Sequence, residues 1–172
     1  MQRIKWTDRK FEFNYPTALY PEMIERLRGA PARLEEYFNS TPREHLIARA
    51  AAKWSIQENA GHLLDLDSLV LQRIDEYIGG ATVLHAADIT NRATHEKQYN
   101  DLASETIAES FRQRRFEIVR KLEGLDAEIF ARIAVHPRLN IPMRLVDMLF
   151  FQAEHDDYHF TRISELRKLI AK

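Results

Sequence analysis

Histidine is the residue type in this sequence with the clearest capacity for chemistry. The chain has seven histidines and no cysteine, which excludes thiolate nucleophiles, disulfides and cysteine-ligated metal sites. His155 and His159 are spaced i, i+4, so on a helix their rings lie on one face and can bind a single ion. A pair at this spacing also arises by chance in a chain with this many histidines. The pair alone therefore does not establish a site.

His62 lies on a different predicted helix and adds a third imidazole. All three histidines lie beside the apolar arc of their helix, at positions typical of a pocket wall. Three neutral imidazoles from two facing helices would hold a divalent ion and leave a position open to water, as in catalytic zinc sites. The alternative is that His62 makes a helix–helix hydrogen bond while His155 and His159 lie on a half-exposed surface. The spacing alone favours this alternative.

Four carboxylates lie near these histidines in the sequence. Glu58 and Asp65, one turn before and one turn after His62, are the nearest candidates for a general base, with an exposed helix position as the alternative. Asp67 and Asp156 fall within apolar arcs, where a buried carboxylate needs a partner. That partner is either an arginine in an interhelical ion pair or the second N–H of a metal-binding histidine.

A polar connection over residues 81–100 is too long for a simple turn, and such loops often contribute to binding sites. Within it, Asn91, Arg92 and His95 are candidates to cover a pocket or to bind an anionic cosubstrate. An ordinary loop role is the alternative. The basic run 112–115 is interpreted as a solvated helix face, because glutamates flank it on the same helix.

The apolar periodicity predicts four long helices, which pack as one all-α four-helix bundle in a single domain spanning residues 1–172. The predicted helices cover about residues 17–39, 55–79, 102–123 and 142–169. Ser55 and Glu58 fit a capping box at the start of the second helix. Gly29 and Pro31 predict a bend or break in the first helix, and Pro142 fits the first turn of the last one.

Composition excludes several classes of protein. The net charge is −1, so neither nucleic acid nor a membrane surface is an expected partner. No long apolar run or signal peptide is evident, and a cytoplasmic protein is expected. The five glycines do not form a dinucleotide fingerprint, a phosphate loop or a nucleophile elbow. None of the histidines follows a glutamate by three residues, which excludes a carboxylate-bridged di-iron bundle.

Two segments, 54–63 (WSIQENAGHL) and 153–159 (AEHDDYH), resemble the DinB/YfiT-like family. The resemblance extends over nearly the whole chain. Segments 25–33, 87–92 and 136–138 are similar to a poorly characterised branch of that family. The resemblance implies a four-helix bundle that binds a divalent transition metal through His62, His155 and His159, and it implies a homodimer. Zinc or nickel is expected, because imidazole ligands suit borderline ions.

The same resemblance implies a class of reaction. Characterised members include metal-dependent thiol transferases that use bacillithiol, mycothiol or glutathione, and a mycothiol-dependent isomerase. A chain without cysteine can obtain a thiolate from such a cosubstrate. The leading interpretation is therefore a low-molecular-weight-thiol S-transferase acting on small molecules, followed by a metal-dependent hydrolase. A non-catalytic metal- or ligand-binding bundle with a role in stress responses is the alternative.

Overall fold

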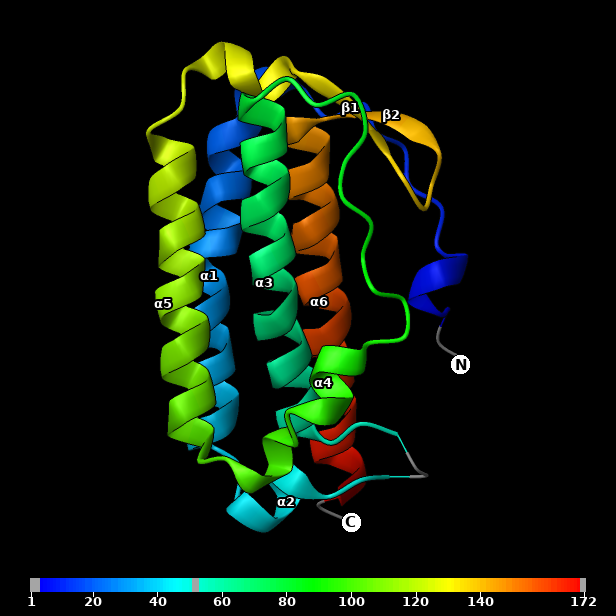
Figure 1. Cartoon of the computed structure of the whole chain (residues 1–172). Coiled ribbons are helices and arrows are strands. Elements are labelled where there is room, and N and C mark those ends of the chain that lie inside the picture. Colours follow the sequence, from blue (N-terminus) through cyan, green and yellow to red (C-terminus); the bar gives the residue numbers. More distant parts are fainter. Residues whose placement is uncertain (1–3, 51–52, 171–172) are drawn as a thin grey trace.

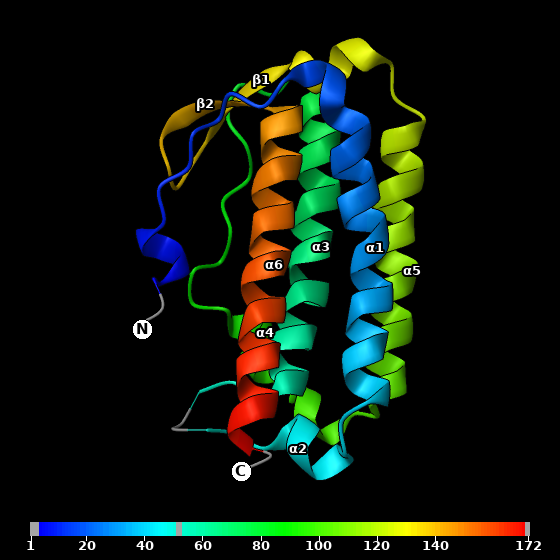
Figure 2. The same cartoon turned by 180° about the vertical axis from the view of Figure 1, so that it is seen from behind.

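The computed structural model describes residues 4–50 and 53–170. The first three residues, which belong to the segment searched for a signal peptide, lie outside the described residues. Its long helices are α1 (Tyr20–Asn39), α3 (Ile56–Ile78), α5 (Ser104–Glu123) and α6 (Leu145–Ile170). Helices α1 and α3 each pack against both α5 and α6, which gives the predicted four-helix bundle (Figures 1 and 2). Within the described ranges, none of the helices is both long and apolar enough to cross a membrane.

Shorter elements precede the first long helix and connect the long helices. They are α2 (Arg43–Ile47), α4 (Arg92–Glu96), the strands β1 (Ile133–His136) and β2 (Ile141–Arg144), and the 3-10 turns Trp6–Asp8, Thr17–Leu19, Tyr99–Asp101 and Ala127–Ala131. The N-terminal segment and the connection between α3 and α4 both run along the outside of α6 and α3 (Figure 1). Both segments therefore lie on the side of the bundle where the two helices with the candidate histidines meet.

The expected start of α3 is confirmed, whereas the expected break in α1 is wrong. The Ser55 hydroxyl accepts from the Glu58 N–H at 3.0 Å, and the Glu58 carboxylate accepts from the Ser55 N–H at 2.8 Å, which completes the capping box. Helix α1 runs without interruption through Gly29 and Pro31. Pro31 is buried, and the packing of α1 against its neighbours offsets the backbone hydrogen bond that proline cannot make.

The last helix does not begin at Pro142 as predicted. Pro142 lies in β2, opposite Val135 of β1, and the antiparallel hairpin makes the fold mostly helical rather than purely α. Helix α6 begins at Leu145, where the Asp147 carboxylate accepts from the Arg144 N–H at 3.2 Å. The connection after α3 joins this hairpin, because the Leu84 N–H donates to the Val135 carbonyl at 3.0 Å.

A buried ion cluster divides the hydrophobic core. Arg115 of α5 is fully buried and bonds Asp67 of α3 at 2.8 Å and Asp156 of α6 at 2.5 Å. Along each of these helices the cluster residue lies between two hydrophobic groups, one toward the hairpin end of the bundle and one toward α2. The ion-pair alternative for the two aspartates is therefore confirmed. The interpretation of run 112–115 as a solvated face is wrong for Arg115, which is buried. The sequence alone does not distinguish Arg115 from its basic neighbours.

Replacing Arg115 tests how strongly this cluster stabilises the bundle. We expect Arg115→Met to lower the free energy of unfolding by about 3–5 kcal/mol, because two buried carboxylates lose their counter-ion. The matched control is Arg114→Met, whose side chain is half exposed and bonds the exposed Glu117, and which should change stability by less than about 1 kcal/mol. Chemical denaturation measures both. Equal stability of the two variants would contradict the role assigned to the cluster.

Candidate metal centre

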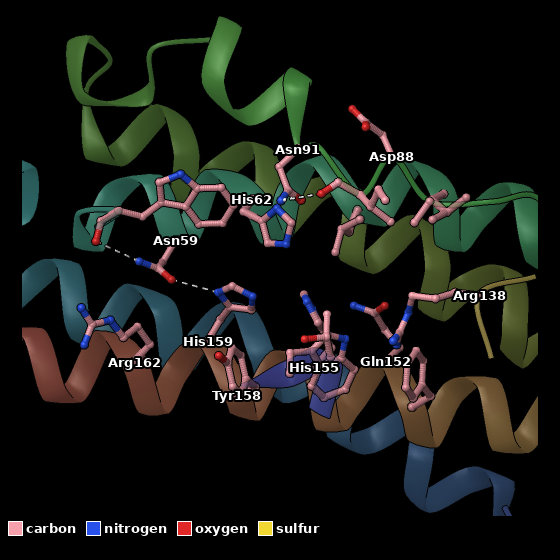
Figure 3. A pocket seen from close by; sticks show the side chains of 18 of the residues that line it. Asn59, His62, Asp88, Asn91, Arg138, Gln152, His155, Tyr158, His159 and Arg162 are labelled. Carbon is pink, nitrogen blue, oxygen red and sulfur yellow. Dashed lines mark hydrogen bonds between the residues drawn. The ribbon is translucent and has the colours of Figure 1, made fainter. Parts of the chain in front are cut away.

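Three imidazoles from two helices converge on one point at the wall of a cavity. His62 projects from α3, and His155 and His159 project from α6 (Figure 3). Their ring centroids are 4.5 to 5.4 Å apart, and one ring nitrogen from each lies within 4.8 Å of the others. All three side chains are buried. The structure thus brings together all the histidines that the sequence analysis assigned to metal binding.

The orientation of His159 is fixed by Asn59. His159 Nδ1 lies 2.9 Å from Asn59 Oδ1, and Asn59 Nδ2 donates to the Ser55 carbonyl at 2.7 Å and the Trp54 carbonyl at 3.3 Å. These two backbone contacts identify Oδ1 as the amide atom that faces the ring, and an oxygen can only accept there. His159 therefore carries its proton on Nδ1, so that the lone pair is on Nε2.

A relay of two hydrogen bonds orients His62 in the same way. Its Nδ1 lies 3.3 Å from Thr94 Oγ1, and this hydroxyl donates to Asp65 at 2.8 Å. Because the Thr94 hydroxyl donates its proton to Asp65, it accepts a hydrogen bond from His62 Nδ1–H. The lone pair of His62 is therefore again on Nε2. Asp65 is itself held by Lys97 and the Tyr99 hydroxyl, each at 2.6 Å. Residues around a metal-binding histidine commonly act in this way.

His155 tests whether the side chains of the centre fit a metal ion. Its Nδ1 is buried and has no hydrogen-bond partner within residues 4–50 and 53–170. A buried polar atom in this condition is unfavourable, and a divalent ion bound to the imidazole would remove the penalty. The oriented lone pairs of His62 and His159 lie beside this ring. The donor set therefore fits a divalent metal that takes three protein ligands.

The environment keeps His62 and His155 neutral, as metal binding requires. Burial lowers the pKa of His62 to about 4, and nearby Asp65 opposes this shift only in part. Burial also lowers the pKa of His155 well below its usual value, with a further contribution from His62. Neither ring has to lose a proton at neutral pH before it binds a cation.

Hydrogen bonds hold both candidate general bases, Glu58 and Asp65, in fixed positions. Glu58 completes the capping box and accepts two hydrogen bonds from Arg49, which together with Ser55 lower the pKa of Glu58 although burial opposes them. Asp65 accepts from Thr94, Lys97 and Tyr99. The lowered pKa makes Glu58 a weaker proton acceptor, and Asp65 is engaged by three hydrogen-bond donors.

The candidate loop residues separate into two groups. Asn91 and His95 line the cavity, and Asn91 begins α4 in the left-handed region with φ of 54°. Arg92 points elsewhere: it is exposed and pairs with Glu96 at 3.4 Å. Thr94, which the sequence analysis did not single out, contacts His62 Nδ1. A threonine in a polar loop has no distinguishing signal until the loop is placed against His62.

The cavity has a volume of about 1140 Å³ and lies between α3, α6 and the segments outside them. Trp54 and Trp6 form its aromatic walls beside the histidines, with ring centroids 4.8 Å from His62 and 4.9 Å from His155, respectively. Asn91 and residues 86–89 line it from the connection after α3, and Arg138 lines it from the hairpin. The three imidazoles thus face a chamber large enough for more than one small molecule.

Metal binding should depend on the three histidines as one unit. We expect about one divalent transition metal ion per parent chain, and loss of most of the affinity in His62→Ala, His155→Ala and His159→Ala. Asn59→Ala should lower affinity about 10- to 100-fold, because it releases the ring of His159. Matched controls are His45→Ala and His85→Ala, both outside the cavity lining. Isothermal titration of the chelator-treated protein measures these affinities, and unchanged affinity in His155→Ala would remove the site.

The metal-free protein should lose stability on acidification. An unfolded histidine titrates near pH 6.5, whereas folded His62 titrates near pH 4, so between these values the unfolded chain binds the extra proton. The free energy of unfolding is therefore fully retained above pH 6.5. It should fall by roughly 1 kcal/mol per pH unit for such a residue as the pH drops toward 4. Chemical denaturation from pH 7.5 to 4.5 measures this slope. A His62→Gln variant should show a shallower slope, and an identical slope would contradict the assignment.

Comparison with known proteins agrees with this fold. The model of the DinB superfamily matches residues 26–163. No curated protein matches the chain in sequence. The solved structure of YfiT from Bacillus subtilis, described as "a probable metal-dependent hydrolase with an unusual four-helix bundle topology", is similar with a TM-score of 0.81 and 18% identity, over 95% of this chain and 94% of YfiT.

A second similar fold is that of a mycothiol-dependent maleylpyruvate isomerase. Its structure has a TM-score of 0.68 and 7% identity over 88% of this chain, and a point mutant of the same enzyme gives 0.67 and 6%. The chain spans 62% of the length of that isomerase. The family model covers most of the described bundle, including all three histidines. The chain therefore belongs to the DinB superfamily.

Proposed function

We propose that this chain is a divalent-metal-dependent enzyme that transfers a low-molecular-weight thiol to an electrophilic small molecule. The observation that carries the proposal is the group of three buried imidazoles, oriented by Asn59 and Thr94, at the wall of a cavity of about 1140 Å³. Zinc or nickel suits this ligand set. The donor geometry supports a catalytic centre over a closed structural one, because protein ligands fill only three positions.

Two properties of the chain favour a thiol as the nucleophile. A divalent ion held by neutral imidazoles keeps its full charge and lowers the pKa of a thiol or water that it binds. The chain has no cysteine of its own, so the thiol comes from a cosubstrate. The cavity exceeds the volume of a typical single-ligand pocket, which leaves room for the thiol and the electrophile together.

The residues of the chain orient the reactants and control access of water. Trp6 and Trp54 cover two of the three imidazoles, and hydrogen bonds that His62 donates to Thr94 and His159 donates to Asn59 hold these rings in place. His95 lines the cavity with its ring 5.7 Å from Trp54, and in this scheme it passes the proton that the thiol loses to solvent. Glu58 and Asp65 act as positioning residues in this scheme.

Hydrolysis is the second candidate function. It is supported by the similarity to YfiT, whose description as a probable metal-dependent hydrolase applies to that protein. In this case water replaces the thiol as the nucleophile at the same centre. A non-catalytic role in binding a metal or a ligand is the remaining alternative, and the experiment below separates all three.

The reaction should require both metal and an added thiol. We expect the zinc- or nickel-loaded protein to conjugate glutathione, bacillithiol or mycothiol to a haloarene electrophile, with a new C–S bond, release of halide and loss of the thiol proton to solvent. Mass spectrometry of the conjugate measures this. Activity should disappear after chelation and in His155→Ala, while His85→Ala retains it. Metal-dependent ester or amide cleavage without thiol would favour hydrolysis, and the absence of both activities would favour a binding protein.

A further inference from the structure

A second cluster of cationic and donor side chains lies at the hairpin end of the cavity. Arg73 projects from α3, His136 is the last residue of β1, and Arg138 follows in the hairpin turn. All three line the same cavity as the histidine centre. Burial, together with the nearby charges of Arg73 and Arg138, lowers the pKa of His136 to about 4. The three side chains therefore interact electrostatically. His136 is therefore neutral and the cluster carries two positive charges.

Arg73 is a buried cation without a carboxylate partner in ion-pair contact among residues 4–50 and 53–170. Its side chain is 6% exposed, and Nε and Nη2 both donate to the His85 carbonyl, at 3.1 and 2.8 Å. The nearby Glu76 carboxylate is engaged elsewhere: it accepts from the His85 N–H at 2.8 Å and from Gln72 at 3.2 Å. Burying a charge in this way is unfavourable unless a partner compensates it.

His136 and Arg138 add directed donors to the cluster. His136 is buried, and its Nδ1 accepts from the Leu139 N–H at 3.3 Å, which puts the ring proton on Nε2. The Arg138 guanidinium lies 5.8 Å from the ring centroid of Phe151, and it has no carboxylate within ion-pair distance in the described ranges. Figure 3 shows Arg138 reaching into the cavity beside Gln152. The cluster therefore offers N–H donors to an anion and no negative charge of its own.

Apolar groups separate this cluster from the metal centre. The ring of Phe151 lies 5.3 Å from His136 and 4.9 Å from Trp6, and Trp6 lies 4.9 Å from His155. Leu66, Leu69 and Met148 line the cavity as well. A ligand that reaches from this cluster to the metal centre would place an anionic end at the arginines and its other end at the imidazoles. Its apolar body would lie along the aromatic and aliphatic wall.

We propose that Arg73, His136 and Arg138 form a carboxylate-binding subsite for the small-molecule substrate. A carboxylate matches the planar guanidinium groups and the single imidazole donor, and the adjoining apolar wall suits an organic acid. The subsite selects electrophiles that carry a carboxylate and orients the rest of the molecule toward the three histidines. This orienting role rests on the proposed function, whereas binding of the anion depends only on the chain itself.

Binding of benzoate to the chelator-treated full-length protein tests the subsite without metal or turnover. We expect saturable binding of benzoate by isothermal titration calorimetry and no binding of the neutral isostere benzamide. Arg138→Gln, at an exposed position, should weaken benzoate binding at least about tenfold. The matched control is Arg120→Gln, which removes the same charge from an exposed position on α5 outside the cavity lining and should bind as the parent does.

Further variants and ligands distinguish the carboxylate subsite from its alternatives. His136→Asn should also weaken benzoate binding, with circular dichroism confirming that the variant keeps its helices. Equal affinity in Arg138→Gln and the parent would overturn the subsite. Inorganic phosphate bound as tightly as benzoate would overturn the carboxylate assignment in favour of a general anion site. Benzoate binding that depends on Arg138, in a protein that conjugates no thiol, would support the subsite while contradicting the proposed function.

Discussion

The ion cluster of Arg115 with Asp67 and Asp156 sets the register on which the metal centre depends. Asp67 lies five residues after His62 on α3, and Asp156 directly follows His155 on α6. Hydrophobic groups above and below the cluster would tolerate a small sliding of one helix along another, but a guanidinium with two fixed carboxylates does not. A shift of α3 by one turn would move His62 by about 5.4 Å and separate it from the other two rings.

Local signals in the sequence predict the long helices, and non-local contacts explain where the prediction fails. The Ser55–Glu58 capping box is complete within four residues, so it can be recognised before any tertiary structure is known. Pro142 is equally compatible with a first helical turn and with a strand. Only pairing with Val135 across the hairpin selects the strand. Arg115 looks like its basic neighbours until α3 and α6 bring two carboxylates to it.

The candidate metal centre was predictable to a similar extent. Spacing and the family resemblance identify His62, His155 and His159, because ligand type and helical period are properties of the sequence. The groups that orient these rings are less visible. Asn59 contacts His159 across 100 residues, and Thr94 reaches His62 from a loop whose path depends on Tyr99. Gly61 permits that path, since a Cβ there would come within 2.2 Å of the Tyr99 ring.

The candidate metal ligands and the outer wall of the cavity come from different parts of the chain. The three imidazoles project from helices whose register the core fixes, whereas Arg138, His136, Asn91 and Trp6 lie on segments outside the bundle. Such segments can change without disturbing the helices. Structures with 18% and 7% identity to this chain share its fold while their descriptions name a hydrolase and an isomerase. The helices therefore predict a metal centre, and the substrate has to be inferred from the cations and rings that surround it.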